Sequence, residues 1–200
     1  MKEILAEKLK MTTLYADDGT AIPVTVVKAG PVFVIEKRGE NRYLIGFKEA
    51  KKQKKPILGI LKKAKIEKPL KFLAEIETEE ELKPGEKITV DKVLSEKDTV
   101  SVTGLSKGKG FAGTIKRWGF SRGPETHGSE HQRRPGSIGS MWPQRVIPGK
   151  KMAGRMGGQK RTIKNLKVVK IEPENNLVFI KGAVPGGKHS LLRIKKVEEK

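Results

Sequence analysis

The chain has 200 residues, 43 lysines and arginines against 23 acidic residues, a net charge of +20 and no cysteine. The lack of cysteine excludes disulfide scaffolds and thiolate metal sites, and no apolar run reaches the 18 residues typical of a membrane helix. The excess of positive charge favours nucleic acid as the partner, and the mixed-charge start after Met1 is unlike a secretion signal, so we expect a cytosolic protein.

Residues 11–47 carry a β pattern. Four short strands are expected at 11–15, 22–28, 32–37 and 42–47, separated by turn residues such as Asp17-Asp18-Gly19 and Gly30-Pro31. Short strands with turns at this spacing favour a barrel or a sandwich.

Residues 48–68 differ in kind. A run of lysines precedes Ile57, Ile60, Leu61 and Ala64, which recur at helical spacing and predict a short amphipathic helix. A solvated surface excursion without a helix is the open alternative.

The strand pattern resumes beyond this excursion. Strands are expected at 70–77, 87–93, 98–103, 162–172, 177–181 and 191–197, with a helical turn at 79–81 and turns at 84–85 and 173–176. The fold class is therefore mainly β, with one β core interrupted by a basic segment.

That basic segment, residues 106–161, is the most informative part of the chain. It holds six lysines and seven arginines against two glutamates, a net charge of +11, with 12 of the 22 glycines, both tryptophans and no leucine. Such a segment cannot bury enough apolar surface to offset its ordering entropy. We expect it to fold against a polyanion.

A glycine motif at the start of this segment invites an enzymatic interpretation. Gly108, Gly110 and Gly113 fit the G-x-G-x-x-G pattern, but no long helix follows, and Arg133 stands where a dinucleotide site needs an acidic residue. The Walker pattern for phosphate binding requires serine or threonine after its lysine, and it fails here because Lys109 is followed by Gly110. No paired acid or nucleophile is visible, so we expect no enzyme, only a backbone that can approach phosphates closely.

Two histidines form an H-x-x-E-H pattern with Glu130. On a helix His127 and His131 could seat zinc, but Pro124, Pro135 and the internal Gly128 oppose a helix. We therefore expect no metal site. We expect instead that the two imidazoles hydrogen-bond phosphate or ribose, or stack on a base.

Aromatic residues in the segment stand beside cations. Trp118 and Phe120 lie among Lys116, Arg117 and Arg122, and Trp142 lies near Arg145. This mixture suits unstacked RNA bases. A small satellite core is the alternative for Trp118 and Phe120.

Several blocks carry a family resemblance. They run in order along nearly the whole chain: Met11–Thr12, Pro23–Val26, Val102–Trp118, Thr126–Gly128, Arg134–Gly139, Gly149–Gly154 and Val178–Gly186. In these blocks the chain resembles the universal family of large-subunit ribosomal proteins numbered three, in its bacterial form. The family's early G-x-K-x-G-M-T signature appears here as Ala6–Thr12 with both glycines replaced.

The resemblance implies a β-barrel core over 1–105 and 160–200, with the helical excursion at about 48–68, and an extended, largely irregular RNA-binding loop over 106–159. It also implies a structural ribosomal protein that binds large-subunit RNA near its 3′ region, helps to start subunit assembly and sends this loop towards the peptidyl-transferase centre. The partners would be ribosomal RNA and neighbouring ribosomal proteins, with no cofactor, membrane or small-molecule substrate. A free-standing RNA chaperone is the alternative function.

The residues expected to contact RNA are the cations, histidines and tryptophans of the segment. Trp142 is expected near the tip of the loop. The full set is Lys107, Lys109, Lys116, Arg117, Trp118, Arg122, His127, His131, Arg133, Arg134, Trp142, Arg145, Lys150, Lys151, Arg155, Lys160 and Arg161.

Overall fold

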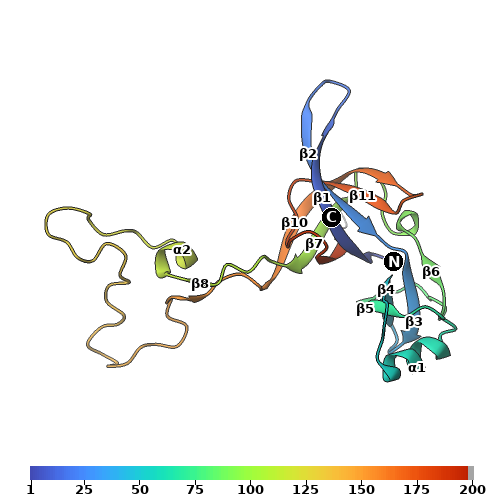
Figure 1. Cartoon of the computed structure of the whole chain (residues 1–200), viewed down its shortest axis with the longest axis horizontal. Coiled ribbons are helices and arrows are strands. Elements are labelled where there is room, and N and C mark those ends of the chain that lie inside the picture. Colours follow the sequence, from blue (N-terminus) through green and yellow to red (C-terminus); the bar gives the residue numbers. More distant parts are fainter. Residues whose placement is uncertain (198–200) are drawn as a thin grey trace. The chain divides into compact units, whose positions relative to one another are not determined.

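The computed structural model describes residues 1–197 and divides into two compact units. One unit, here called the body, joins Met1–Leu105 with the residues from Lys160 onward, and the other, here called the extension, is Ser106–Gln159. The predicted mainly β class is confirmed, because strands make up most of the regular structure (Figure 1).

Six strands of the body follow one another in a closed barrel, in the order β1-β12-β7-β10-β11-β2, and all neighbours are antiparallel. Their bounds are β1 Glu3–Tyr15, β2 Ala21–Ala29, β7 Thr99–Leu105, β10 Lys160–Glu172, β11 Leu177–Lys181 and β12 Leu191–Lys196. Alternation along the strands explains the barrel core, since Val100 and Val102 in β7, and likewise Leu192 and Ile194 in β12, are fully buried two positions apart.

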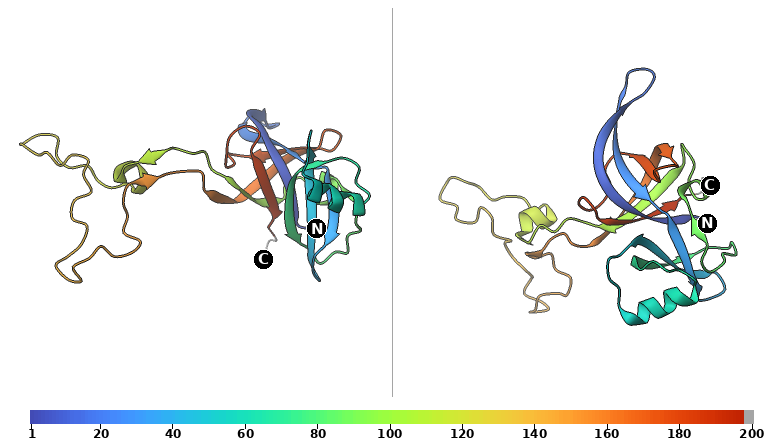
Figure 2. Two further views of the ribbon diagram at one scale, coloured as in Figure 1. Left: turned by 60° about the horizontal axis from the view of Figure 1, so that its bottom comes forward. Right: turned by 45° about the vertical axis from the view of Figure 1, so that its right-hand side comes forward.

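A second sheet lies within the body. Its order is β5 (Leu70–Glu77), β4 (Arg42–Glu49), β3 (Val32–Lys37) and β6 (Lys87–Ile88). One face, with Val34 and Ile45, shares a hydrophobic cluster with the barrel, and the other packs Ile35 and Leu70 against helix α1 (Lys55–Lys63). Figure 2 shows α1 beside this sheet. The predicted amphipathic helix is confirmed.

Three sequence expectations differ from the structure. Residues 32–88 build this second sheet and not part of the barrel. The strand expected at 87–93 ends at Ile88, and Val90–Lys92 form a 3-10 helix, η1, because the buried residues there are spaced three and four apart. The helical turn expected at 79–81 is a bend, in which the Glu80 amide donates to the Thr78 hydroxyl at 3.3 Å.

Strand β1 also begins eight residues before the expected position. It runs through the stretch where the family's two glycines are replaced, with a register shift between Lys8 and Lys10. Three charged residues of this strand, Glu3, Glu7 and Lys8, are buried. Each finds polar partners, which is why charge does not end the strand there.

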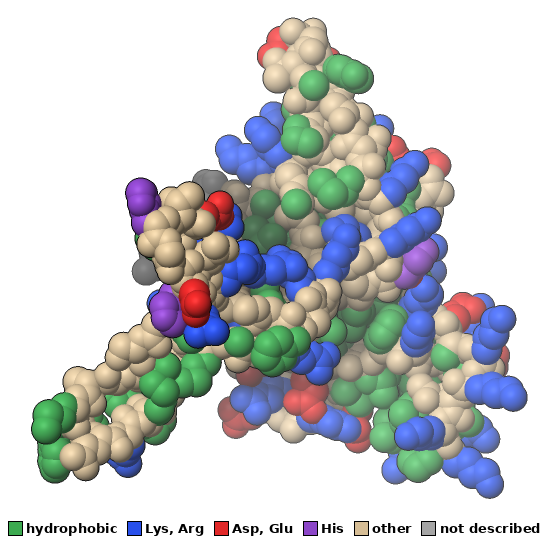
Figure 3. All heavy atoms as spheres, turned by 60° about the vertical axis from the view of Figure 1, so that its left-hand side comes forward, with side chains coloured by type: hydrophobic (Ala, Val, Ile, Leu, Met, Phe, Trp, Pro, Cys, Tyr) green, Lys and Arg blue, Asp and Glu red, His purple; other side chains and the backbone are tan. Residues whose placement is uncertain are grey.

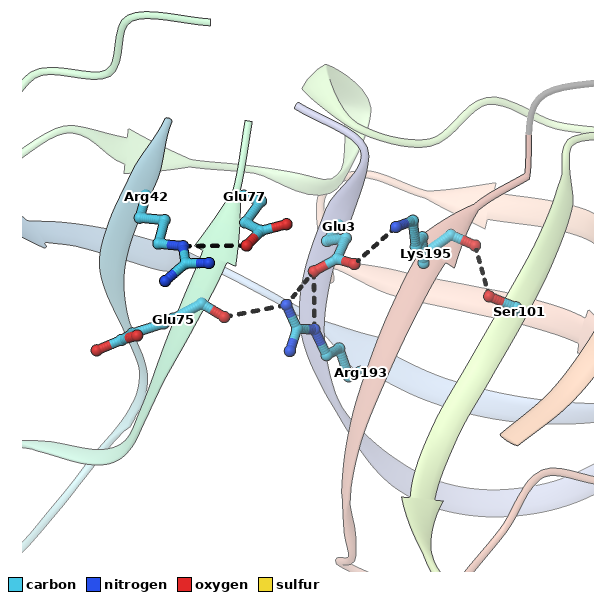
Figure 4. A network of polar contacts seen from close by, with 7 residues as sticks. All are labelled: Glu3, Arg42, Glu75, Glu77, Ser101, Arg193 and Lys195. Carbon is cyan, nitrogen blue, oxygen red and sulfur yellow. Dashed lines mark hydrogen bonds and ion pairs between the residues drawn. The ribbon is translucent and has the colours of Figure 1, made fainter. Parts of the chain in front are cut away.

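Glu3 anchors a polar network that joins the barrel to the second sheet (Figure 4). Arg193 of β12 donates from Nε to the Glu3 carboxylate at 2.7 Å and from Nη2 to the Glu75 carbonyl oxygen of β5 at 3.0 Å. Lys195 Nζ lies 3.5 Å from the same carboxylate. A separate exposed pair in this view joins Arg42 and Glu77.

Glu7 holds a second junction in the body. Lys48 Nζ of β4 donates to both of its carboxylate oxygens at 2.8 Å, and His189 Nδ1 lies 2.8 Å from Oε1. Burial acts to raise the pKa of Glu7, but the hydrogen bonds and charges of Lys48 and His189 outweigh it, so the pKa lies below its ordinary value. Glu7 is therefore ionised in the folded protein at neutral pH.

Candidate nucleic-acid interface

Backbone hydrogen bonds form the base of the extension. The Lys109 amide donates to the Met156 carbonyl oxygen and the Met156 amide to that of Gly110, both at 2.9 Å. Next along the chain, β8 (Phe111–Ala112) pairs with β9 (Gly154–Arg155). The extension thus starts as two antiparallel segments whose order depends on the main chain.

Glycine is required at one point of this base. Gly157 has φ 74°, and a Cβ there would collide with the carbonyl oxygen of Lys107 on the opposite segment. Gly158 also has positive φ, but a Cβ there would meet only the side chain of Arg155 at 3.5 Å. The two segments can approach this closely only because residue 157 has no side chain.

A short helix, α2 (Thr114–Trp118), follows β8 and ends at Gly119 in the left-handed conformation. Arg117 Nη1 and Trp118 Nε1 both donate to the Met152 carbonyl oxygen at 2.8 Å. The Arg117 guanidinium lies 4.9 Å and Lys151 Nζ 5.8 Å from the centroid of the Trp118 ring. These contacts hold α2 against the returning chain.

The contacts of Trp118 test the alternative of a small satellite core. Its partners are cations and a carbonyl oxygen, its side chain is 42% exposed, and neither hydrophobic cluster of the described chain includes a residue of the extension. Trp118 is therefore not part of a satellite core. An exposed ring with two cations beside it is the combination of aromatic and positive charge that suits a nucleic-acid base and its phosphate.

Residues 121–153 form no helix or strand. Short local bonds shape this stretch: Gly123 donates to the Gln132 carbonyl oxygen at 3.0 Å, and Arg122 pairs with Glu125. His127 and Gly128 have positive φ, so the H-x-x-E-H pattern does not lie on a helix. Within residues 1–197 no three His, Cys, Asp or Glu side chains gather as a metal site would require.

The extension has almost no interior. Of its residues only Ala112 and Thr114 are buried. Its eleven lysines and arginines face two glutamates, which gives a net charge of +9. Large apolar side chains are also left outside, with Trp142 and Phe111 each 81% exposed. A charged, glycine-rich segment with exposed aromatics is what a binding surface for irregular RNA needs.

The structure places fifteen of the seventeen expected contact residues in the extension, and Lys160 and Arg161 at the start of β10 in the body. All are exposed except Arg117, which is half-buried and already bonded to Met152. Figure 3 shows histidine side chains, in purple, at the surface of the molecule. Arg133, Arg134 and Arg145 have no hydrogen bond or ion pair with any residue of 1–197.

Sequence reasoning missed two residues that belong to this candidate interface. Phe111 stands beside Lys109, the same pairing of ring and cation that singled out Trp118, so the signal was present. Met152 contributes through its carbonyl oxygen, which side-chain identity does not reveal.

Over residues 1–197, no helix combines the length and the apolarity that crossing a bilayer requires.

The chain is similar to one protein family and to individual members of it. The model of the family described as ribosomal protein L3 matches residues 73–176. The chain is 49% identical to the large ribosomal subunit protein uL3 of Carboxydothermus hydrogenoformans, over 97% of this chain and 96% of that protein. It is 47% identical to the uL3 proteins of Thermosipho africanus, over 98% of each chain, and of a Geobacillus species, over 97% of this chain and 95% of that protein.

Proposed function

Because the chain belongs to the ribosomal protein L3 family, we propose that it is a constituent of the large ribosomal subunit that holds ribosomal RNA through its extension. The family resemblance seen in the sequence motifs is confirmed. Proteins of this family are structural and non-enzymatic components of the ribosome, and the bacterial members work in the cytoplasm.

One observation carries the proposal: the extension combines a net charge of +9 with only two buried residues. Mutual repulsion of these cations disfavours a compact extension in the free protein. Phosphates remove that repulsion, since each lysine or arginine that meets a phosphate also releases condensed counterions. The order that the extension cannot obtain from a core would then come from RNA.

The proposed mechanism combines charge neutralisation with shape. Exposed arginines and lysines fix the position of the protein on phosphates without reading sequence. Trp118, Phe111 and Trp142 offer ring faces to unstacked bases, and the glycines let backbone and RNA approach closely. No step of this mechanism changes a covalent bond.

The finer role follows the family resemblance. We propose that the RNA is the 3′ region of the large-subunit RNA, that binding there helps to start subunit assembly, and that Trp142 lies near the peptidyl-transferase centre. The exposure of Trp142 and the absence of any core around it support a role in contact with RNA.

Two measurements test the proposal. The protein should remain with large subunits through a high-salt wash, whereas a free-standing RNA chaperone would be released. Arg133→Ala with Arg134→Ala should lower the slope of log affinity against log salt by about 1 to 2, because each lost phosphate contact removes about 0.7 to 0.9 from that slope.

Lys28→Ala with Lys97→Ala is a matched control, since it removes the same charge from exposed positions of the body. An unchanged slope in the arginine variant, or an equal change in the control, would remove these arginines from the proposed interface.

A further inference from the structure

A second concentration of positive charge lies in the body, around helix α1. Residues 51–68 contain eight lysines, no arginine and one acidic residue, Glu67, which gives a net charge of +7. Lysine and arginine side chains gather in the lower right of Figure 3, over the part of the body that carries α1. None of these residues belongs to the extension, so the proposed function leaves this charge unexplained.

The helix directs this charge outward. Leu61 is buried, and Ile57 and Ile60 pack with it against the second sheet. Because a helix turns once per 3.6 residues, Lys55, Gly59, Lys62 and Lys63 share the opposite side, and all four are exposed. This side, with the exposed flanking lysines 51, 52, 54 and 65, is here called the lysine face.

The body does not neutralise the lysine face. Of the eight lysines in 51–68, only Lys68 has an ion pair within residues 1–197, with Glu49 at 2.7 Å. Lysines in the last turn suit the helix dipole, but Lys54 and Lys55 stand at the first turn, where the dipole disfavours cations and no acidic residue is present. Helix stability alone therefore does not account for the arrangement.

Two residues of the lysine face contradict the ordinary preferences of a helix. Gly59 occupies the middle of α1, where glycine is less stable than alanine, although a Cβ there would meet nothing within 4 Å. Lys65, just after the C-cap residue Ala64, has φ 57°, a left-handed conformation in which glycine is usual. Bare backbone thus lies where a side chain would fit, and a cation lies where glycine would be favoured.

An anionic partner accounts for both exceptions. Lys55 and Lys63 flank Gly59 by one helical turn on either side, so a phosphate could approach the bare backbone between two ammonium groups. Lysine acts as a point charge without the fork that reads a base edge, so the face would follow a phosphate backbone and not a sequence. Departures from local preference are expected at functional sites.

We propose that the lysine face is a second RNA-binding site, which holds the phosphate backbone of large-subunit ribosomal RNA independently of the extension. This inference rests on the proposed function, because it assigns the same class of ligand to another part of the protein.

The first test uses the full chain and a transcript of the complete large-subunit RNA. The triple variant Lys55→Gln, Lys62→Gln and Lys63→Gln should lower the slope of log affinity against log salt by about 2 to 3. The control variant Lys28→Gln, Lys37→Gln and Lys97→Gln removes the same charge from exposed residues elsewhere in the body and should change the slope by less than about 0.5. Equal effects of the two variants would overturn the proposal.

A pair of substitutions at Gly59 tests close approach. Gly59→Ala should raise the melting temperature by about 2 °C, because alanine is the better helix former and the site has room. Gly59→Glu also has room but places a carboxylate among the lysines, and should weaken binding to the transcript by tenfold or more while the protein stays folded. Normal affinity of the folded Gly59→Glu protein would overturn the proposal.

Footprinting of the RNA backbone separates this inference from the proposed function. Loss of one protected region in the lysine-face variant, with the region lost in Arg133→Ala, Arg134→Ala retained, supports a second site. If only the arginine variant loses protection, the lysine face has no RNA contact and the proposed function stands. If wild-type protein protects nothing, both fail. A lysine-face variant could also bind RNA normally and yet be absent from assembled subunits. That result would indicate an acidic protein partner and overturn the inference.

Discussion

Gly157→Ala should loosen the base of the extension while the body stays intact. The added Cβ would collide with the Lys107 carbonyl oxygen, and alanine at φ 74° costs about 1 to 2 kcal/mol from local sterics alone. Gly158→Ala is a matched control, because φ 65° brings a similar local cost but the nearest atoms belong to the flexible Arg155 side chain. The difference between the two variants therefore reports the collision, for which we expect about 2 kcal/mol.

Amide hydrogen exchange measures this difference directly. The amides of Lys109 and Met156 are held by the bonds across the base, so their exchange should be about thirtyfold faster in Gly157→Ala than in Gly158→Ala, since each 1.36 kcal/mol is a factor of ten. Amides of Val100 and Val102, in barrel strand β7, should exchange at the same rate in both. Equal exchange of Lys109 and Met156 in the two variants would refute the claim that close approach at Gly157 orders the base.

Three further outcomes test other parts of the structure. Trp142→Ala should leave the melting temperature of the free protein within about a degree or two, because the ring is 81% exposed, but ribosomes carrying it should form peptide bonds more slowly. Arg193→Ala should cost about 2 kcal/mol, or roughly 4 to 8 °C in melting temperature, whereas loss of the exposed ion pair in Arg42→Ala should cost less than about 1 kcal/mol. Glu7→Gln should lower the free energy of unfolding at pH 7, measured by urea denaturation. Because the folded-state pKa of Glu7 is lowered, the stability it contributes is present above its unfolded pKa of about 4.5 and is lost as pH falls below it, so the two proteins should converge in acid.

Periodicity predicted the strands that follow ordinary rules. The expected strands at 70–77 and 177–181 match β5 and β11 residue for residue. The first eight residues of β1 were missed because Glu3, Glu7 and Lys8 interrupt the apolar pattern. Arg193 and the carbonyl oxygens of Val184 and Gly186, which are partners of Glu3 and Lys8, lie more than 170 residues away. Lys48, a partner of Glu7, lies 41 residues away, so none of these contacts leaves a local signal.

The second sheet was missed for a related reason. Both of its faces are covered, so Tyr43, Leu44 and Ile45 are all buried, and a run of apolar residues does not reveal which sheet receives them. The features of the candidate interface were easier to anticipate, because charge, glycine content and aromatic residues can be read directly from the local sequence. Its base was not, since the requirement at Gly157 arises from Lys107, fifty residues earlier.

The pairing of β7 with β10 has a consequence for how the family can vary. Leu105 and Lys160 are partners across neighbouring strands, so the 54 residues of Ser106–Gln159 form one long loop closed by the barrel. Closure entropy grows only as the logarithm of loop length, about 0.6 kcal/mol for each doubling. Lengthening or shortening the extension by several residues therefore leaves the barrel almost equally stable. Under the proposed function its length is free to follow the shape of the bound RNA, and natural selection can adjust its reach without redesigning the fold that carries it.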